Sequence, residues 1–399
     1  MALGIDPYVS DWLDLIFRWF HVTAAIVWIG TSFYFVALDQ HLHEPRDERD
    51  RERGVGGESW EIHGGGFYRI EKFRVAPPRL PKPLHWYKWE AYWTWLSGFT
   101  LLIVLYYLQA GTNLIDPSVA KLSTGGAVAI SIGGLAIAWV VYDVLCRTIG
   151  RRSELVLALC ILGLATLASW GAGQLFAARA AYLQVGAMLG TIMAANVFFV
   201  IIPAHWELVR AKEAGREPDP GANRRGKQRS VHNNYFTLPV LFTMLAGHFP
   251  FTYGHDHAWA ILVCLMVIGA WVRHYFNNRH AGRTLWWIPL TAAAGIAAVA
   301  VWIRPADIAP AAGGLRVPFA QVAPIVALRC APCHSMHPTL VSAPPKGIVL
   351  ETAAEIRAQA SLVQTVAVES HVMPLGNVTK MTDTERKLLG IWISQGAKP

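Results

Sequence analysis

The chain alternates between long apolar segments and polar connections that are rich in Lys and Arg. A helix needs roughly 20 apolar residues to cross a bilayer. Eight segments come near that length, at about 13–39, 91–111, 125–145, 154–172, 181–203, 235–250, 258–275 and 285–303. The sixth is the shortest and contains Pro239. Because backbone polar groups in lipid must be satisfied within the segment, the pattern predicts an all-α fold, a polytopic transmembrane bundle of about eight spans.

The basic residues are concentrated in alternate connections. The loops 40–90 and 204–234, the turn after the third segment and the end of the seventh together carry 23 Lys and Arg, whereas the intervening connections carry only Lys121 and Arg179. Basic residues favour cytoplasmic loops. The alternation therefore predicts that the basic loops lie inside and that both termini lie outside. It also supports the short sixth span, because removing that span would break the alternation.

Composition agrees with a membrane protein. Hydrophobic residues make up 53% of the 399 residues and charged residues only 16%, well below the share of about 25% in soluble domains. The net charge of +8 lies in the loops between apolar segments, so nucleic acid is not an expected partner. The first apolar segment, 13–38, is too long for a signal peptide and has no basic residues before it, so we expect it to be retained as a span.

The C-terminal quarter of the chain has a different character. Residues 304–316 contain two prolines and two glycines among alanines, which is typical of a linker. Residues 317–399 have the composition of a small soluble domain. The sequence therefore predicts a membrane domain at 1–303, a linker at 304–316 and a periplasmic domain at 317–399.

Residues 330–334 read Cys-Ala-Pro-Cys-His, the attachment pattern for a covalent c-type haem. Cys330 and Cys333 would add to the vinyl groups, and His334 would be an axial ligand of the iron. A thioredoxin-like pair needs a strand–helix setting that is missing here, and a zinc site needs further Cys or His ligands, of which only His337 is near. The three other cysteines are isolated in apolar segments and are expected to be buried side chains.

The second axial ligand is expected some tens of residues downstream. Met373, followed by Pro374, resembles the Met-Pro loop of class I cytochromes c, and ligation by Met and His raises the reduction potential. Met381 and His371 are the alternatives. The segment from Asp383 to Gln395 is predicted to form the C-terminal helix of such a domain.

Ionisable residues inside apolar spans are candidates for function. His21 lies in the outer half of the first span, and His248 ends the sixth near the outer face. A lone imidazole in an apolar helix is costly without a partner. Ligation of the iron of a b-type haem by His21 and His248 is one explanation, and a hydrogen bond to a neighbouring helix is the other. His205 and His274, at the inner ends of their spans, are expected to be polar helix-end residues at the membrane interface.

Several long runs resemble the PuuD-type membrane-bound urate oxidases of bacteria. They are Arg18-Trp19-Phe20-His21, Trp28 to Phe35, His63 to Tyr68, Leu84 to Tyr92 and Arg229 to Pro239. The resemblance covers essentially the whole chain, including the fused cytochrome c. It implies oxidation of urate to 5-hydroxyisourate in purine degradation. The electrons would pass through the haem to the respiratory chain, to a terminal oxidase or a soluble cytochrome. It also implies a multi-pass protein of the bacterial inner membrane.

A pocket for urate, a flat anion, would need amide or guanidinium donors, an aromatic surface and a base. Residues of these types gather near the cytoplasmic face. The candidates for catalysis are His63, His85 and His232, and those for substrate binding are Arg69, Phe67, Tyr68, Trp86, Arg229, Asn233 and Asn234. The glycines that follow His63 could let the backbone approach a ligand or simply form a flexible loop.

Two further functions fit parts of this pattern. A membrane cytochrome c subunit of a quinol or other dehydrogenase would need the haem but not the long cytoplasmic loops. A transporter would need paired intramembrane acids, which the spans lack. An internal site for urate would also lie ~30 Å of hydrocarbon away from an external haem, which indicates either a relay cofactor or a reaction near the outer face.

Overall fold

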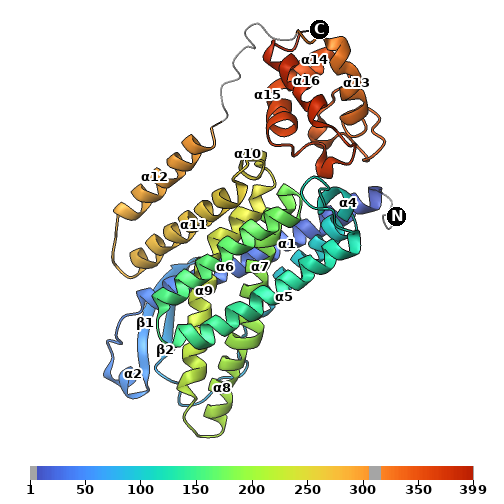
Figure 1. The fold of residues 1–399 in the computed structure, drawn as a ribbon. Coiled ribbons are helices and arrows are strands. Elements are labelled where there is room, and N and C mark those ends of the chain that lie inside the picture. Colours follow the sequence, from blue (N-terminus) through green and yellow to red (C-terminus); the bar gives the residue numbers. More distant parts are fainter. Residues whose placement is uncertain (1–6, 305–315, 399) are drawn as a thin grey trace.

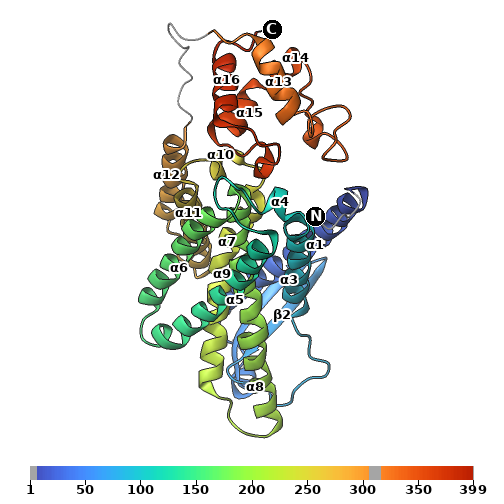
Figure 2. The same cartoon turned by 45° about the vertical axis from the view of Figure 1, so that its right-hand side comes forward.

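The computed structural model describes residues 7–304 and 316–398. Figure 1 shows a long helical bundle with a smaller helical unit, formed by the C-terminal residues, at one end. The 45° view in Figure 2 places α8 and the β1–β2 hairpin towards the opposite end of the bundle. The C-terminal unit and the basic hairpin therefore lie at opposite ends of the bundle.

A helix occupies each of the eight predicted segments. They are α1 (Pro7–His41), α3 (Trp89–Leu102), α5 (Thr124–Thr148), α6 (Glu154–Leu175), α7 (Ala178–Asn196), α9 (Pro220–Ala246), α11 (Ala258–His280) and α12 (Trp287–Trp302). Five stretches of the described chain are long and apolar enough to cross a membrane: Asp11–His41, Thr124–Arg151, Glu154–Leu175, Ala178–Glu213 and Ala258–His280.

The other three helices, α3, α9 and α12, are not long or apolar enough by themselves to cross a membrane. α3 gives way to a π-helical turn, η1 (Ile103–Tyr107), and a short α4 (Ala110–Asn113) follows. α12 has only 16 residues. α9 begins in a polar stretch, so its apolar part is a minority of the helix. Length and composition therefore support several membrane-spanning helices, five of them directly.

The predicted loop 204–234 is wrong, because most of it is helical. α7 continues through η3 (Val197–Ile201) into α8 (Ile202–Glu213), and α9 already begins at Pro220. The Asp219 side chain accepts hydrogen bonds from the backbone N–H groups of Gly221 and Ala222, which caps α9. A search for apolar segments misses this start, since the first turns of α9 are polar and extend beyond the apolar span.

The core of the bundle is built around α7, which packs against α5, α6 and α9. Small residues allow the close approach of these helices. A Cβ atom added at Gly186 would lie 2.0 Å from Thr243 Oγ1, so a larger residue at position 186 would push α9 away from α7. Short elements connect the bundle: α2 (Glu48–Glu52), η2 (Ile149–Arg151) and α10 (Pro250–Tyr253).

The all-α prediction omitted a hairpin in the loop 40–90. β1 (Val55–His63) pairs antiparallel with β2 (Gly66–Phe73), and Gly64 and Gly65 have positive φ angles at the turn. One face of the hairpin is fixed to α1, where Tyr34 donates to Glu61 and Lys72 pairs with Asp39. The hairpin is too short and too polar to register as an apolar segment.

The C-terminal unit has its own hydrophobic core, which includes Val322, Leu389 and Trp392. Its elements are α13 (Phe319–Arg329), η4 (Pro345–Gly347), α14 (Ala353–Ala358), α15 (Ala360–Val363), η5 (Gln364–Glu369), η6 (Leu375–Asn377) and α16 (Asp383–Ser394). α16 confirms the predicted C-terminal helix. Residues 305–315 of the predicted linker lie outside the described residues.

The C-terminal unit contacts the end of the bundle that carries α4 and α10 (Figure 1). Gly376, at a positive φ of 56°, lies so close to the α4 backbone that an added Cβ would be 2.7 Å from the Thr112 carbonyl oxygen. Ser342 also donates a hydrogen bond to Asp11 of α1. The loop that carries Met373 therefore faces the bundle.

Candidate functional site

Cys330, Cys333 and His334 form one compact turn at the end of α13. The backbone N–H groups of Cys333 and His334 donate to the Cys330 carbonyl, at 3.1 and 2.8 Å. Neither cysteine is in a disulfide. Burial raises the pKa of the Cys330 thiol to about 11. The two cysteines and His334 on one turn are the residue types that covalent attachment of a haem would use, and the haem itself stays a prediction.

His334 is oriented as an axial ligand would need to be. Its Nδ1 contacts the Ile348 carbonyl at 3.0 Å, an arrangement in which Nε2 would be the nitrogen that binds a metal. Met373 packs against the core of the unit, and its carbonyl accepts a hydrogen bond from Arg386. Met381 is only 2% exposed in the same core, and His371 is exposed with a positive φ of 52°. The choice of Met373 as second ligand stays a prediction.

A first polar cluster, the Arg229 cluster, lies inside the bundle between α5, α7 and α9. Arg229 is 1% exposed and pairs with Asp143 at 2.7 Å. The Tyr142 hydroxyl bonds to His232 Nδ1 at 2.8 Å and accepts from Asn196. The cluster thus places two predicted site residues, Arg229 and His232, around one buried tyrosine.

Asn233 extends the Arg229 cluster. Its side chain donates to the Met193 carbonyl and accepts from Asn196. His232 also lies 3.6 Å from Glu154, whose carboxylate is exposed. A histidine held between a tyrosine and a glutamate has the partners that a proton-transfer group requires.

A second polar cluster, the Arg273 cluster, lies where α1, α9 and α11 meet. Arg273 is 3% exposed, donates to the Asn234 side-chain oxygen and stands 3.7 Å from the centre of the Phe33 ring. Asn234 in turn donates to Asn277 at 3.0 Å. Sequence reasoning found Asn234 but not Arg273, because Arg273 was counted only as a basic residue at the end of a span. Its position within a long apolar helix was the signal that could have identified it.

The predicted residues of the hairpin form a separate group. Arg69 is held by Asp50 and Glu58, and its hydrogen bond lowers the pKa of Asp50. Phe67 is 79% exposed, and His63 and Tyr68 are also exposed. The structure therefore does not bring these residues into contact with either buried cluster among the described residues.

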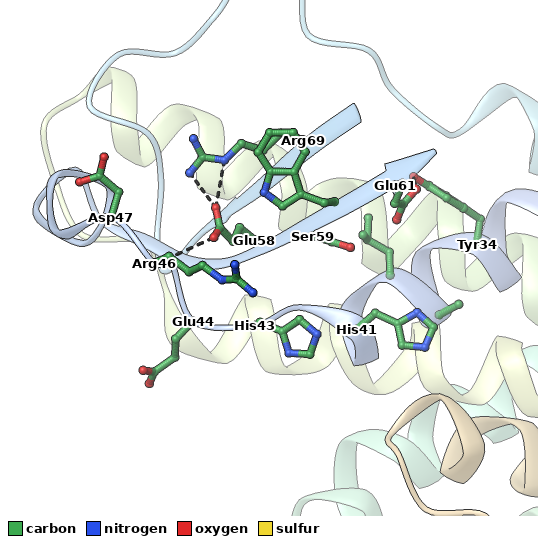
Figure 3. A pocket seen from close by; sticks show the side chains of 13 residues that line it. Tyr34, His41, His43, Glu44, Arg46, Asp47, Glu58, Ser59, Glu61 and Arg69 are labelled. Atoms are coloured by element: carbon green, nitrogen blue, oxygen red, sulfur yellow. Dashed lines mark hydrogen bonds and ion pairs between the residues drawn. The ribbon is translucent and has the colours of Figure 1, made fainter. Parts of the chain in front are cut away.

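A pocket of 1080 Å³ lies between the hairpin and the end of α1, and Figure 3 shows the side chains that line it. Arg69 projects from β2 and bonds to Glu58 across the strand pair. The other acidic residues of the lining are Glu44, Asp47 and Glu61, and the other basic residue is Arg46. With four carboxylates against two guanidinium groups, this pocket is electrostatically unfavourable for an anion.

Trp86 and His85 lie on the chain that leads into α3. Trp86 stacks on Trp206 of α8 with a centroid distance of 4.4 Å. His85 is exposed and contacts Tyr87. Trp86 therefore joins α8 to the start of α3, whereas His85 faces the surface.

His21 forms a hydrogen bond to a neighbouring helix, which is the second of the two explanations that the sequence allowed. Its Nδ1 lies 3.0 Å from the Thr94 carbonyl and 3.1 Å from Ser97 Oγ of α3. Gly98 leaves room for the ring, since an added Cβ would be 2.8 Å from it. Nε2 of His21 forms no hydrogen bond among the described residues. No contact joins His21 to His248 in the part of the chain that the structure describes, so paired ligation by these two residues stays a prediction.

The structure defines a mostly helical protein with several helices that could cross a membrane and with buried, arginine-containing clusters at their ends. Residues 7–304 match the family model described as "Urate oxidase N-terminal", which is well over half of the chain. The chain therefore belongs to this family, and its function is that of a urate-related oxidase, an oxidoreductase. No curated protein and no solved structure matched the chain.

Proposed function

We propose that this protein is a membrane-bound urate oxidase that converts urate to 5-hydroxyisourate and passes the electrons through its own c-type haem to the respiratory chain. The observation that carries the proposal is the joining of two parts in one chain. A bundle of the urate oxidase family spans residues 7–304, and the Cys330–His334 turn lies in a separate core beyond it.

The chemistry requires an electron acceptor. Urate loses two electrons and two protons and gains a hydroxyl oxygen from water, so the two electrons must leave the substrate. Cys330, Cys333, His334 and Met373 would hold a c-type haem, which when bound supplies a one-electron acceptor. A terminal oxidase or a soluble cytochrome is the proposed next acceptor. No peroxide is formed if the electrons leave by this route.

The proposed arrangement is a bundle of eight spans in the bacterial inner membrane. α3, α9 and α12 occupy the three predicted segments that are not long or apolar enough by themselves. The basic connections would be cytoplasmic, and the N-terminus and the C-terminal unit periplasmic. Location of the C-terminal unit at the end away from α8 supports this orientation (Figure 2).

His232 is the strongest of the three proposed catalytic histidines, because it alone lies in a buried polar cluster. Its proposed role is to accept a proton from urate, with Tyr142 orienting the imidazole. His63 and His85 remain proposals of lower rank, as both side chains are exposed.

A b-type haem is a second proposed cofactor, with His21 as a ligand and His248 as its partner. The support is the free Nε2 of His21, whose Nδ1 is held by α3. Such a group would supply a one-electron relay between the membrane faces. A pyridine haemochrome spectrum of active, purified protein tests it, and a spectrum with only the c-type component would refute this part.

The main test is urate-dependent reduction of the c-type absorption band in isolated membranes. We expect urate to reduce the band without oxygen. The matched control replaces both Cys330 and Cys333 with Ala, which should abolish the band while the bundle still inserts. Reduction by a quinol but not by urate would instead favour a cytochrome subunit of a dehydrogenase complex.

Assignment of the axial methionine needs a separate variant pair. Met373→Ala is expected to remove the sulfur-to-iron charge-transfer band and to lower the reduction potential. Met381→Ala should leave that band in place, although its loss from the core will reduce stability. Loss of the band in Met381→Ala alone would reverse the assignment.

A further inference from the structure

Two arginines of the bundle, Arg273 and Arg229, are almost fully buried and keep guanidinium nitrogens without a hydrogen-bond partner among the described residues. Arg273 is 3% exposed, and its guanidinium donates to Asn234 through Nε, while Nη2 is the nitrogen without a partner. Phe33 covers one face of the guanidinium. A buried donor without a partner is costly, which is a reason to look for a missing ligand.

Its charge is also uncompensated. Among the described residues, no Asp or Glu forms an ion pair with Arg273, whereas Arg229 pairs with Asp143 and Arg69 pairs with Asp50 and Glu58. Buried charges in folded proteins are normally paired, because removing an isolated ion from water is very unfavourable. The missing partner of Arg273 is therefore expected to be an anion that does not belong to this chain.

We propose that Arg273 binds the anionic edge of the substrate, and that the Arg273 cluster is the urate subsite of the bundle. This inference rests on the proposed function. Urate is a flat monoanion at neutral pH whose oxygens can accept from a planar guanidinium. Nη2 of Arg273 provides free donors, and the paired amides of Asn234 and Asn277 place further polar groups beside it.

The surroundings suit a flat, partly apolar ligand. Phe33 supplies an aromatic ring from α1. On the residue that follows Asn234, the Tyr235 hydroxyl contacts His274 Nδ1 at 2.7 Å, and the His274 ring stacks on Trp271. Aromatic rings together with a few fixed polar groups are the side-chain types typical of small-molecule sites.

Arg179 is the other candidate in the bundle for binding an external anion, and it differs from Arg273 in position and burial. It too makes no ion pair among the described residues, and its Nε lacks a partner. Arg179 lies beside Gly247 at the start of α7, near the C-terminal unit, so it belongs to the other end of the bundle. It is only half-buried, so water can solvate its charge, whereas Arg273 is closed off.

The test measures urate binding in two ways on the full-length, haem-loaded protein. One is the urate concentration that half-saturates reduction of the c-type band. The other is the rise in unfolding temperature that urate produces under anaerobic conditions without a downstream acceptor, since a ligand that binds only the folded state stabilises it. The variants are Arg273→Gln, Arg273→Lys and, as the matched comparison, Arg179→Gln.

Loss of a buried charged contact is expected to raise the half-saturating urate concentration about 30-fold or more in Arg273→Gln. Arg273→Lys keeps the charge but not the planar guanidinium with its paired N–H donors, so its affinity for urate should lie between that of Arg273→Gln and that of the unmodified protein. Arg179→Gln should be within about threefold of the unmodified protein. The rise in unfolding temperature with urate should disappear only in Arg273→Gln.

An unchanged half-saturating concentration in Arg273→Gln, or a rise confined to Arg179→Gln, would overturn the proposal. In either case urate would still reduce the haem, so the proposed function would stand. If urate neither reduces nor stabilises the unmodified protein, the proposed function fails first. Should Arg273→Gln fold poorly, Arg273→Lys decides the question, because a half-saturating concentration unchanged in that variant is also incompatible with recognition by a planar fork.

Discussion

The Arg229 cluster and the Arg273 cluster both bury an arginine within the same helical bundle, but only the charge of Arg229 is compensated by a carboxylate of the described chain. Arg229 is 1% exposed and has Asp143 at 2.7 Å, so the charge is neutralised within the chain. Arg273 is 3% exposed and has only neutral partners among the described residues. Equal burial therefore does not imply an equal role.

The difference separates an arginine whose charge is paired within the chain from one whose charge is not paired among the described residues. An internal ion pair through Nη2 of Arg229 ties α9 to α5 and compensates the charge without a ligand, while Nε and Nη1 of Arg229 have no hydrogen-bond partner among the described residues. An unpaired buried charge is unfavourable until an external anion arrives. Breaking the Arg229–Asp143 pair should therefore mainly destabilise the protein, whereas removing the Arg273 charge should mainly abolish urate binding.

Asp143→Asn is expected to have the largest effect on stability. It leaves Arg229 buried without its counter-charge, which typically costs about 3–5 kcal/mol. The unfolding free energy of purified protein in detergent measures the effect. Arg147→Gln is the control, because Arg147 pairs with the same carboxylate but is 52% exposed and should cost about 1 kcal/mol or less. Equal losses in the two variants would contradict the comparison.

Asn234→Ala should have an intermediate effect. It removes the acceptor of Arg273 Nε and the donor to Asn277, and leaving buried polar groups unsatisfied costs about 1–3 kcal/mol. The half-saturating urate concentration should rise as well, but less than in Arg273→Gln, because the guanidinium remains. A stability loss without any change in urate affinity would place the substrate elsewhere.

Arg273→Gln should change stability least of the three core variants. Because the charge is unpaired, its removal relieves a desolvation cost that partly offsets the lost bond to Asn234. We expect the unfolding free energy without urate to change by about 1 kcal/mol or less. The same measurement on Arg229→Gln supplies the contrast, where a clearly larger loss is expected. A loss as large as that of Arg229→Gln would mean that Arg273 has an internal partner after all.

The smallest and most local effect is expected in the β1–β2 hairpin, where it depends on pH. Arg69 lowers the pKa of Asp50, and the backbone N–H of Arg46, followed by Arg69, lowers that of Glu58. Carboxyl groups with a lowered pKa in the folded state stabilise it above their unfolded pKa of about 4, and this contribution is lost as the pH falls further. Hydrogen exchange in residues 55–73 should therefore accelerate, relative to its intrinsic rate, between about pH 5 and pH 3.

Arg69→Gln is the matching variant for the hairpin. It removes the cation that Asp50 and Glu58 share, so the hairpin should be looser at neutral pH and depend less on pH. A hairpin that keeps its full pH dependence in Arg69→Gln would show that other groups are responsible.

Much of the architecture was predictable because it follows local rules. Apolar length predicted a helix at each of eight segments. The charge alternation predicted that the basic loop 40–90 and the C-terminal unit lie on opposite membrane faces, and the two lie at opposite ends of the bundle. The Cys330–His334 turn is a contiguous motif, so its geometry depends on a few neighbouring residues. The helical start at Pro220 and the hairpin were missed, because capping and strand pairing are not visible in a profile of apolar length.

The sequence by itself determined the helices, the alternation of basic connections, the C-terminal motif and the kinds of side chain available for a planar anion. It could not distinguish Arg69, Arg229 and Arg273, since all three are arginines near the same predicted membrane face. Only the tertiary structure showed which of them has a carboxylate partner, because Asp143 reaches Arg229 across 86 positions of the chain and Asp50 reaches Arg69 across 19. The free energy of a buried charge depends on its neighbours in space, and packing between distant helices selects those neighbours.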